Sequence, residues 1–328
     1  MTTDEQYMWR CIQLARCGEQ GAAPNPMVGA VIVADGRIIG EGYHIRCGGP
    51  HAEVNAIASV RDASLLQRAT IYVSLEPCAH YGKTPPCADL IVSKGIPRCV
   101  VGCTDPFAKV NGLGIKKLRD AGVEVVVGVL EEECRALNGR FMTYHSKHRP
   151  CVTLKWAQST DGFIDRERQA DETPTMFSTP ATSVLVHRLR ATHQAILVGT
   201  NTALRDNPSL TTRLWPGTNP LRLVVDRHNR LPDTLRLFND EASTHVYTSE
   251  SLDDILDDLY QRGIQSLLVE GGAQLLQSFI DAGLWDEARV ESAPFALRRG
   301  VASPTLCCAE IASAEQVNGN TITLYRHA

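Results

Sequence analysis

The chain has 328 residues, 43% of them hydrophobic, and a formal net charge of −4 at pH 7, a length typical of two domains. Its basic residues are dispersed, which argues against a broad nucleic-acid-binding surface, and no apolar run approaches ~18 residues, so no membrane or secretory segment is expected. Eleven cysteines without a repeating pattern fit a reducing cytoplasm better than a disulfide framework.

The first half of the sequence predicts helices and strands in alternation. Helical spacing of apolar residues indicates a helix over 4–17, and two apolar runs flank Asp35-Gly36, which is typical of a hairpin turn. Strands are predicted next over 69–75, 98–102 and 123–127, and helices over 52–60, from Pro85-Pro86 through Cys87, over 114–121 and around 131–144. This alternation is typical of a three-layer α/β domain. The basic run 144–150 is the best linker candidate, with a solvated helix end as the alternative.

Within this alternation, His51-Ala52-Glu53 is followed by Pro77-Cys78 and by Cys87. One imidazole and two thiolates leave one position of a tetrahedral zinc ion free for water. If His51 begins one helix and Cys87 begins another, both helix N-termini direct positive potential at the thiolates. Glu53 then stays off the metal and carries protons between the water, a ring nitrogen and departing ammonia. The spacing therefore predicts a zinc deaminase.

Two plainer interpretations stay open for these residues. Each half of the motif also occurs by chance, because free cysteines are mostly small buried apolar residues. The second interpretation is a structural zinc site, for which Cys47 lies close enough in sequence to be the fourth ligand. A structural site has no use for a glutamate beside a ligand, however. The order His-x-Glu, Pro-Cys and Cys matches the zinc nucleobase deaminases.

The second half begins with an apolar strand over 151–157 that leads to the turn 158–162. A helix over 181–190, strands over 195–198, 221–226 and 266–269, and a helix after Gly271-Gly272 are predicted next. Glycines at such a strand-to-helix turn let a dinucleotide pyrophosphate approach backbone N–H groups. No Gly-x-Gly-x-x-Gly fingerprint occurs, so a Rossmann domain is not indicated.

Several segments of the first half carry a resemblance to a known family. They are 24–29 (Pro-Asn-Pro-Met-Val-Gly), 42–44 (Gly-Tyr-His), 51–53 and the long stretch 76–87 that begins Glu-Pro-Cys. Over essentially its whole length, the sequence resembles the bifunctional deaminase–reductases of riboflavin biosynthesis. The resemblance implies a cytidine-deaminase-like three-layer α/β domain over 1–147 and a dihydrofolate-reductase-like α/β domain over 148–328.

For the first domain, the resemblance implies Glu53 as the catalytic acid and base, and a diaminopyrimidinone with a ribosylamino 5′-phosphate as the substrate. The implied zinc ligands are His51, Cys78 and Cys87. Residues at positions that the family uses around the pyrimidine and its phosphate are Asn25, His44, His80 and Lys83. An amide can satisfy a ring edge and a lysine can meet a phosphate. A turn residue between prolines is the alternative for Asn25, and a satisfied strand-end histidine for His44.

For the second domain, the resemblance implies NADPH-dependent reduction of the ribosylamino group to a ribitylamino group, with Lys155 or a bound water as the candidates that help protonation. The implied substrate positions are Arg190, Leu210, Arg213 and Glu270, where each arginine offers a planar fork of donors. The implied cofactor positions are Ala157, Ser159, Met176, Thr202, Asp206, Arg227, Gly271 and Gly272. Arg227 follows a strand, where a cation could meet an adenosine 2′-phosphate. A charged helix end is the alternative for Arg190.

One segment departs from the family. Between Asp161 and Arg190 the family has Gly-Glu-Ser-x-Trp-Ile-Ser/Thr, whereas residues 172–178 of this chain are Glu-Thr-Pro-Thr-Met-Phe-Ser. Counting back from Arg190 places Met176 at the tryptophan that lies against the cofactor, and a one-residue slip places Phe177 there.

The sequence predicts a bifunctional cytoplasmic enzyme that uses Zn²⁺ and NADPH on a small phosphorylated pyrimidine. No nucleic-acid or membrane partner is expected, and assembly into a homo-oligomer is left open. One alternative is a deaminase whose second domain only binds substrate or stabilises an oligomer. Another is a non-enzymatic scaffold stabilised by zinc.

Overall fold

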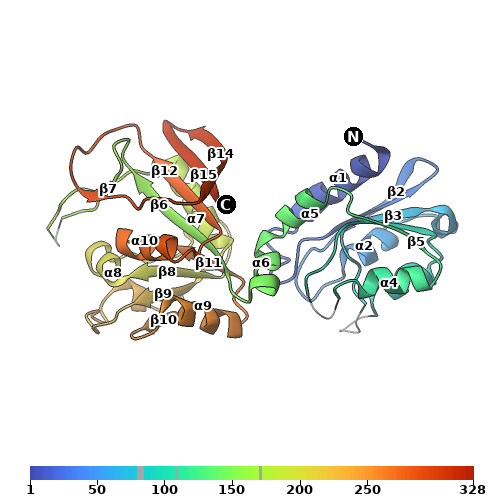
Figure 1. Ribbon diagram of the computed structural model, residues 1–328, viewed down its shortest axis with the longest axis horizontal. Coiled ribbons are helices and arrows are strands. Elements are labelled where there is room, and N and C mark those ends of the chain that lie inside the picture. The colour runs from blue at the N-terminus through green and yellow to red at the C-terminus, as the bar shows by residue number, and fades with distance from the viewer. Residues whose placement is uncertain (80–84, 108–109, 170–171) are drawn as a thin grey trace. The chain divides into compact units, whose positions relative to one another are not determined.

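Figure 1 shows the fold of the computed structural model, which describes residues 1–79, 85–107, 110–169 and 172–328. Its contacts divide the chain into two compact units, Met1–His148 and Arg149–Ala328. None of the helices in these described ranges is long and apolar enough to cross a bilayer.

The first unit is a five-stranded sheet between two layers of helices (Figure 1). The strand order is β2-β1-β3-β4-β5, in which β1 runs antiparallel to β2 and β3, and β3, β4 and β5 are parallel. The strands are β1 (Gly29–Ala34), β2 (Arg37–Tyr43), β3 (Thr70–Leu75), β4 (Arg98–Cys103) and β5 (Glu124–Val127). The helices are α1 (Thr3–Arg16), α2 (Ala52–Ala58), η1 (Ala63–Arg68), α3 (Cys87–Ser93), α4 (Leu113–Asp120), α5 (Glu131–Leu137) and α6 (Gly139–Lys147).

Strand β1 explains why three layers form. Ala30 and Ile32 join the core shared with α2, α3 and α4, whereas Val31 and Val33 join the core shared with α1 and α5. A strand that is buried on both faces reads as one continuous apolar run, as here. Asp35, with φ 51°, lies in the hairpin turn after it. The predicted three-layer α/β architecture is confirmed.

One predicted helix of this unit is broken. Instead of one helix around 131–144, α5 ends at Leu137 and α6 begins at Gly139. Asn138 between them accepts a hydrogen bond from Met27 N at 2.8 Å and donates one to Met27 O, also at 2.8 Å. Helix α6 continues to Lys147, so the first residues of the predicted linker are helical.

The second unit contains an eight-stranded sheet of order β10-β9-β8-β11-β6-β12-β15-β14, parallel from β10 to β12 and antiparallel at β15 and β14. Its strands are β6 (Cys151–Gln158), β8 (Ala195–Gly199), β9 (Leu221–Val225), β10 (Thr244–Tyr247), β11 (Ser266–Val269), β12 (Glu287–Ser292), β14 (Ala309–Val317) and β15 (Asn320–His327), and β7 (Phe163–Asp165) pairs separately with β13 (Val301–Ala302). The helices are α7 (Pro180–Ala191), α8 (Thr200–Asp206), η2 (Arg236–Phe238), α9 (Leu252–Gln261) and α10 (Ala273–Asp281).

The side chains of strand β6 alternate between the two faces of this sheet. Val152, Leu154 and Trp156 pack in the core with α9 and α10. Alternate residues of a strand point to opposite faces, so Lys155 and Ala157 lie on the other face. The ring of His193, which follows α7, contacts the Thr153 hydroxyl at 3.1 Å on that face. Lys155 is therefore a charged residue on the side of the sheet that α7 covers.

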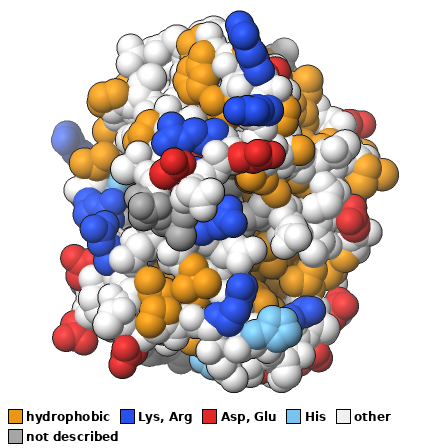
Figure 2. Space-filling model, turned by 90° about the vertical axis from the view of Figure 1, so that its left-hand side faces the viewer, with side chains coloured by type: hydrophobic (Ala, Val, Ile, Leu, Met, Phe, Trp, Pro, Cys, Tyr) orange, Lys and Arg blue, Asp and Glu red, His pale blue; other side chains and the backbone are white. Residues whose placement is uncertain are grey.

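Surface charge is mixed on the face of the second unit drawn in Figure 2. Among the residues shown in colour there, basic side chains are interspersed with acidic and hydrophobic ones. This pattern differs from the continuous basic surface that phosphate backbones require.

Candidate active sites

The three predicted metal ligands converge in the first unit. His51 precedes the first residue of α2, Cys87 begins α3 directly after Pro86, and Cys78 lies in the segment after β3. His51 Nδ1 lies 3.6 Å from Cys78 Sγ and 3.4 Å from Cys87 Sγ. Tetrahedral zinc with ordinary Zn–N and Zn–S bonds holds such atoms about 3.6 Å apart. The donor set and its spacing therefore fit a zinc ion.

The surroundings of the two cysteines favour negative charge on sulfur. Hydrogen bonds from the Cys87 thiol and the His51 ring, together with the Cys87 backbone N–H at 3.3 Å, lower the pKa of Cys78 to about 4. The pKa of Cys87 is raised because its thiol donates to Cys78. Metal binding requires thiolates. The shift at Cys78 is therefore in the direction that metal binding favours, and Cys87 lies beside it.

Glu53 lies in the first turn of α2 and is 3% exposed. Burial, and then the charge of Cys78, raises the pKa of Glu53 to about 7. A cation bound nearby would lower the pKa of Glu53 instead. A buried carboxyl group whose pKa lies near neutrality can both take up and release a proton.

Asn25 and His44 form a hydrogen-bonded pair beside the predicted metal ligands. The His44 Nδ1–H donates to Pro50 O at 3.0 Å, and the Asn25 amide donates to His44 Nε2 at 3.1 Å. Burial lowers the pKa of His44, which favours this neutral ring. The His44 ring also lies edge-on to the His51 ring, with 5.4 Å between centroids. The structure thus brings Asn25 and His44 to the predicted zinc site.

Of the three other candidate residues in the first unit, Cys47, His80 and Lys83, the structure describes only Cys47. Cys47 is exposed and does not join the cluster of metal ligands found in the described part of the chain. His80 and Lys83, both predicted to contact substrate, lie outside the described residues. Their roles stay predictions.

Glu76 is a residue that sequence reasoning missed. Its buried carboxylate accepts hydrogen bonds from the backbone N–H groups of Asp105, Gly112, Gly114 and Ile115 at 2.9–3.3 Å. These groups belong to the start of α4 and the segment before it. A side chain added at Gly114 would place its Cβ 1.9 Å from Pro77 O. Glu76 therefore fixes α4 directly against the segment that carries Cys78.

The second unit contains a cavity of about 690 Å³ at the carboxyl ends of its parallel strands. Its lining includes eight of the predicted reductase residues: Lys155, Ala157, Thr202, Asp206, Arg227, Glu270, Gly271 and Gly272. Gly271 has φ +128°, a conformation that favours glycine. Open space at this turn leaves the N-terminus of α10, which has no side-chain cap, accessible to a ligand.

Five predicted reductase residues do not line this cavity. Ser159 is buried and donates to Asp161 at 2.6 Å, and Leu210 is a core residue at 2% exposure. Arg213 is exposed and donates to the Thr211 hydroxyl at 2.8 Å. Met176 is 73% exposed, whereas Phe177 lines the cavity and stacks on Phe295. In the structure, Phe177 rather than Met176 therefore lines the cavity.

The fifth of these residues, Arg190, forms a buried pair with Glu270. Its Nε and Nη2 donate to the two carboxylate oxygens at 2.9 and 2.7 Å, and Nη1 donates to Thr211 O at 3.3 Å. Burial alone would raise the pKa of Glu270, but the charges of Arg190 and Lys155 lower it to about 2. The predicted phosphate ligand Arg190 therefore already has an internal carboxylate partner.

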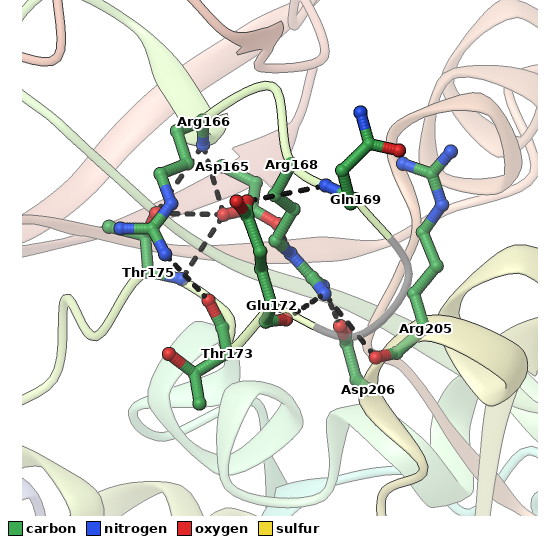
Figure 3. Close-up of polar contacts among 9 residues, drawn as sticks. All are labelled: Asp165, Arg166, Arg168, Gln169, Glu172, Thr173, Thr175, Arg205 and Asp206. Atoms are coloured by element: carbon green, nitrogen blue, oxygen red, sulfur yellow. Dashed lines mark hydrogen bonds and ion pairs between the residues drawn. The ribbon is translucent and has the colours of Figure 1, made fainter.

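Arg168, which sequence reasoning also missed, binds the segment that departs from the family (Figure 3). Its side chain is 2% exposed and donates to Asp165 Oδ2 at 2.5 Å, to Glu172 O at 2.9 Å and to Asp206. Thr175 N and Oγ1 donate to the other Asp165 oxygen at 3.1 and 2.7 Å. The predicted cofactor residue Asp206 is thus held by an arginine from the cavity wall.

Comparison with known proteins agrees with these two sites. Residues 1–103 match the family model described as the cytidine and deoxycytidylate deaminase zinc-binding region, and residues 150–313 match the RibD C-terminal domain. The Riboflavin biosynthesis protein RibD of Aquifex aeolicus is 39% identical over 321 residues, which cover 91% of this chain and 89% of that protein. The RibD of Escherichia coli is 35% identical and covers 89% of this chain and 88% of its own length.

Solved structures give the same result. A diaminohydroxyphosphoribosylaminopyrimidine deaminase/5-amino-6-(5-phosphoribosylamino)uracil reductase from Thermotoga maritima is 38% identical, with a TM-score of 0.90 over 99% of both chains. Acinetobacter baumannii RibD is 31% identical, with a TM-score of 0.88 over 99% of both chains. The chain therefore belongs to the RibD family of riboflavin biosynthesis proteins, with a deaminase domain and a reductase domain in one polypeptide.

Proposed function

We propose that residues 1–147 deaminate a diaminopyrimidinone carrying a ribosylamino 5′-phosphate with the help of zinc, and that residues 148–328 then reduce its ribosyl group with NADPH. The observation that carries this proposal is the convergence of His51, Cys78 and Cys87 beside the buried carboxyl group of Glu53. The name of the Thermotoga maritima relative describes the same pair of reactions.

For deamination, His51, Cys78 and Cys87 would hold a zinc ion, which would supply Lewis acidity that lowers the pKa of water. Glu53 takes the proton released as the water oxygen adds to the ring carbon. It passes this proton to the ring nitrogen, then takes the second proton from the added hydroxyl group and gives it to the amino group, which leaves as ammonia as the carbonyl group forms. The Asn25 amide, held by His44, offers its oxygen to the ring edge. Each of these steps needs Glu53 to change protonation state.

For reduction, the cavity residues would hold NADPH, which would supply a hydride for the open-chain sugar carbon. Lys155 is the chain's own group beside this position, since it lines the cavity next to Glu270. Burial lowers the pKa of Lys155, which makes its ammonium group a better proton donor near neutrality. Lys155 is therefore our candidate for the proton that completes the reduction.

The cavity residues fit a phosphorylated dinucleotide. A Cβ on Gly272 would lie 3.1 Å from the Thr202 hydroxyl, so glycine keeps the turn before α10 open for a pyrophosphate. Arg227 lines the cavity just beyond the end of β9. A guanidinium group there suits the 2′-phosphate that distinguishes NADPH from NADH.

The purified protein tests the proposal when it is given the diaminopyrimidinone phosphate with and without NADPH. We expect ammonia release without NADPH, and NADPH oxidation only after ammonia release. Glu53→Gln should abolish ammonia release, by 10³-fold or more, because the amide cannot carry a proton, while zinc content stays the same. Ammonia release without any NADPH oxidation would leave a deaminase alone, and unchanged turnover in Glu53→Gln would contradict the catalytic role.

Arg227→Ala tests the choice of cofactor. We expect the KM for NADPH to rise roughly tenfold, because a charge-assisted contact to the 2′-phosphate is lost, while the KM for NADH stays the same. Arg262→Ala, directly after α9, is the matched control, since this exposed arginine pairs with Asp258 and does not line the cavity. An equal change for both cofactors would contradict the assignment.

A further inference from the structure

Arg168 pairs with two carboxylates at the wall of the cavity, and only one of the two is fully occupied. At the end of β7, Asp165 Oδ2 accepts a hydrogen bond from Arg168 at 2.5 Å, and its Oδ1 accepts from the N–H and hydroxyl groups of Thr175 at 3.1 and 2.7 Å. The backbone N–H of Arg166 donates to the same Oδ1 at 2.9 Å. Asp165 is therefore committed to holding its own segment together.

Asp206, the other carboxylate, keeps one oxygen for a ligand. It is the last residue of α8, its side chain is 33% exposed, and it lines the cavity. Arg168 donates to its Oδ1, whereas its Oδ2 accepts no hydrogen bond from the residues that the structure describes. Both oxygens of a carboxylate are acceptors. The Oδ2 atom is thus an acceptor at the cavity wall.

Arg168 stabilises a carboxylate in a place where its charge is otherwise unfavourable. The last carbonyl groups of a helix carry partial negative charge, so an acidic residue at this end is repelled. The Arg168 guanidinium group offsets both charges, because it donates to the Asp206 carboxylate and to the Arg205 carbonyl oxygen, the latter at 3.3 Å (Figure 3). Its hydrogen bonds to Asp165 and to Glu172 O fix the guanidinium group itself.

We propose that Arg168 is a positioning residue of the reductase site, which orients the Asp206 carboxylate so that its Oδ2 accepts a hydrogen bond from a hydroxyl or amide group of NADPH. This inference rests on the proposed function, in which NADPH occupies the cavity. The Arg168 side chain is only 2% exposed, so it acts through Asp206 and not on the cofactor directly. Both residues serve one contact, and their effects on cofactor binding are therefore not additive.

The test measures the Kd for NADPH in the full chain, from the change in NADPH fluorescence, for two substitutions and their combination. Arg168→Met and Asp206→Ala should each raise the Kd roughly tenfold, because each removes the same charge-assisted contact. The double variant should bind NADPH no more weakly than Asp206→Ala alone. If Arg168 instead acted only by supporting the fold of its segment, the two losses would multiply to roughly 100-fold.

Arg166→Met is the matched control. Arg166 lies in the same segment, but it is exposed, donates to Thr173 O at 3.2 Å and does not line the cavity. Its loss should leave the Kd for NADPH unchanged. Arg168→Lys keeps the charge but not the planar set of donors, so it should give an intermediate Kd. If urea denaturation shows that Arg168→Met does not fold, Arg168→Lys replaces it in the comparison with Asp206→Ala.

Two results would overturn the inference. One is an unchanged Kd when Arg168 is substituted, and the other is a double variant in which the two losses multiply. If the unsubstituted protein does not bind NADPH at all, the proposed reductase function itself fails, and the role of Arg168 fails with it.

Discussion

Glu270 shows at the scale of one residue how burial and charge oppose each other. The carboxyl group is buried, yet its pKa is about 2 because Arg190 and Lys155 lie beside it. Its ordinary value is 4.5, so the folded state binds this proton less tightly than the unfolded state does. The stabilisation from Glu270 is therefore fully present above pH 4.5 and is lost as the pH falls toward 2.

Glu270→Gln should consequently lower the free energy of unfolding by about 3 kcal/mol at pH 7, because the variant leaves Arg190 buried without its carboxylate. The difference from the unsubstituted protein should shrink as the pH falls from 4.5 toward 2. Urea denaturation at pH 7 and at pH 3 measures both values. A difference that is the same at the two pH values would show that the pair does not govern acid stability.

At the scale of elements, the sequence predicted the alternation of helices and strands well because burial on both faces of β1, β3 and β4 leaves continuous apolar runs. The break at Asn138 was not predicted, since its cause is a hydrogen-bond partner, Met27, that lies 111 positions away in the chain. The choice between Met176 and Phe177 stayed open for a similar reason. It depends on how Arg168 holds the preceding segment, which no local pattern reveals.

Helix α4 offers a prediction at this scale. Glu76→Ala should lower the free energy of unfolding by about 3 kcal/mol or more, because the backbone donors at the start of α4 lose their acceptor in a buried place. Glu76→Gln keeps one acceptor oxygen, so it should lower the free energy of unfolding by less. Asp120→Ala, which removes an exposed pair with Lys116 at the other end of α4, is the control and should have little effect. Equal effects of Glu76→Ala and Asp120→Ala in chemical denaturation would refute the anchoring role.

At the scale of the whole molecule, all three predicted metal ligands belong to Met1–His148 and the cavity belongs to Arg149–Ala328. A ligand stabilises the unit that binds it. We therefore expect scanning calorimetry of the full chain to show two transitions. Zinc removal by dipicolinate should lower the midpoint temperature of one transition by roughly 10 °C. NADPH should raise the midpoint temperature of the other transition only. Transitions that move together under either treatment would indicate that the two units unfold as one.

The contacts of Glu76 also bear on how such a protein can be changed by laboratory evolution. The Glu76 carboxylate holds the start of α4, and Gly114 lies directly against Pro77 O. The segment that carries Cys78 and the first turn of α4, almost 40 positions later, are therefore packed together and cannot shift independently. Libraries that randomise residues near the zinc ligands alone will mostly yield inactive variants. New ring specificities should come instead from varying this segment and the first turn of α4 together.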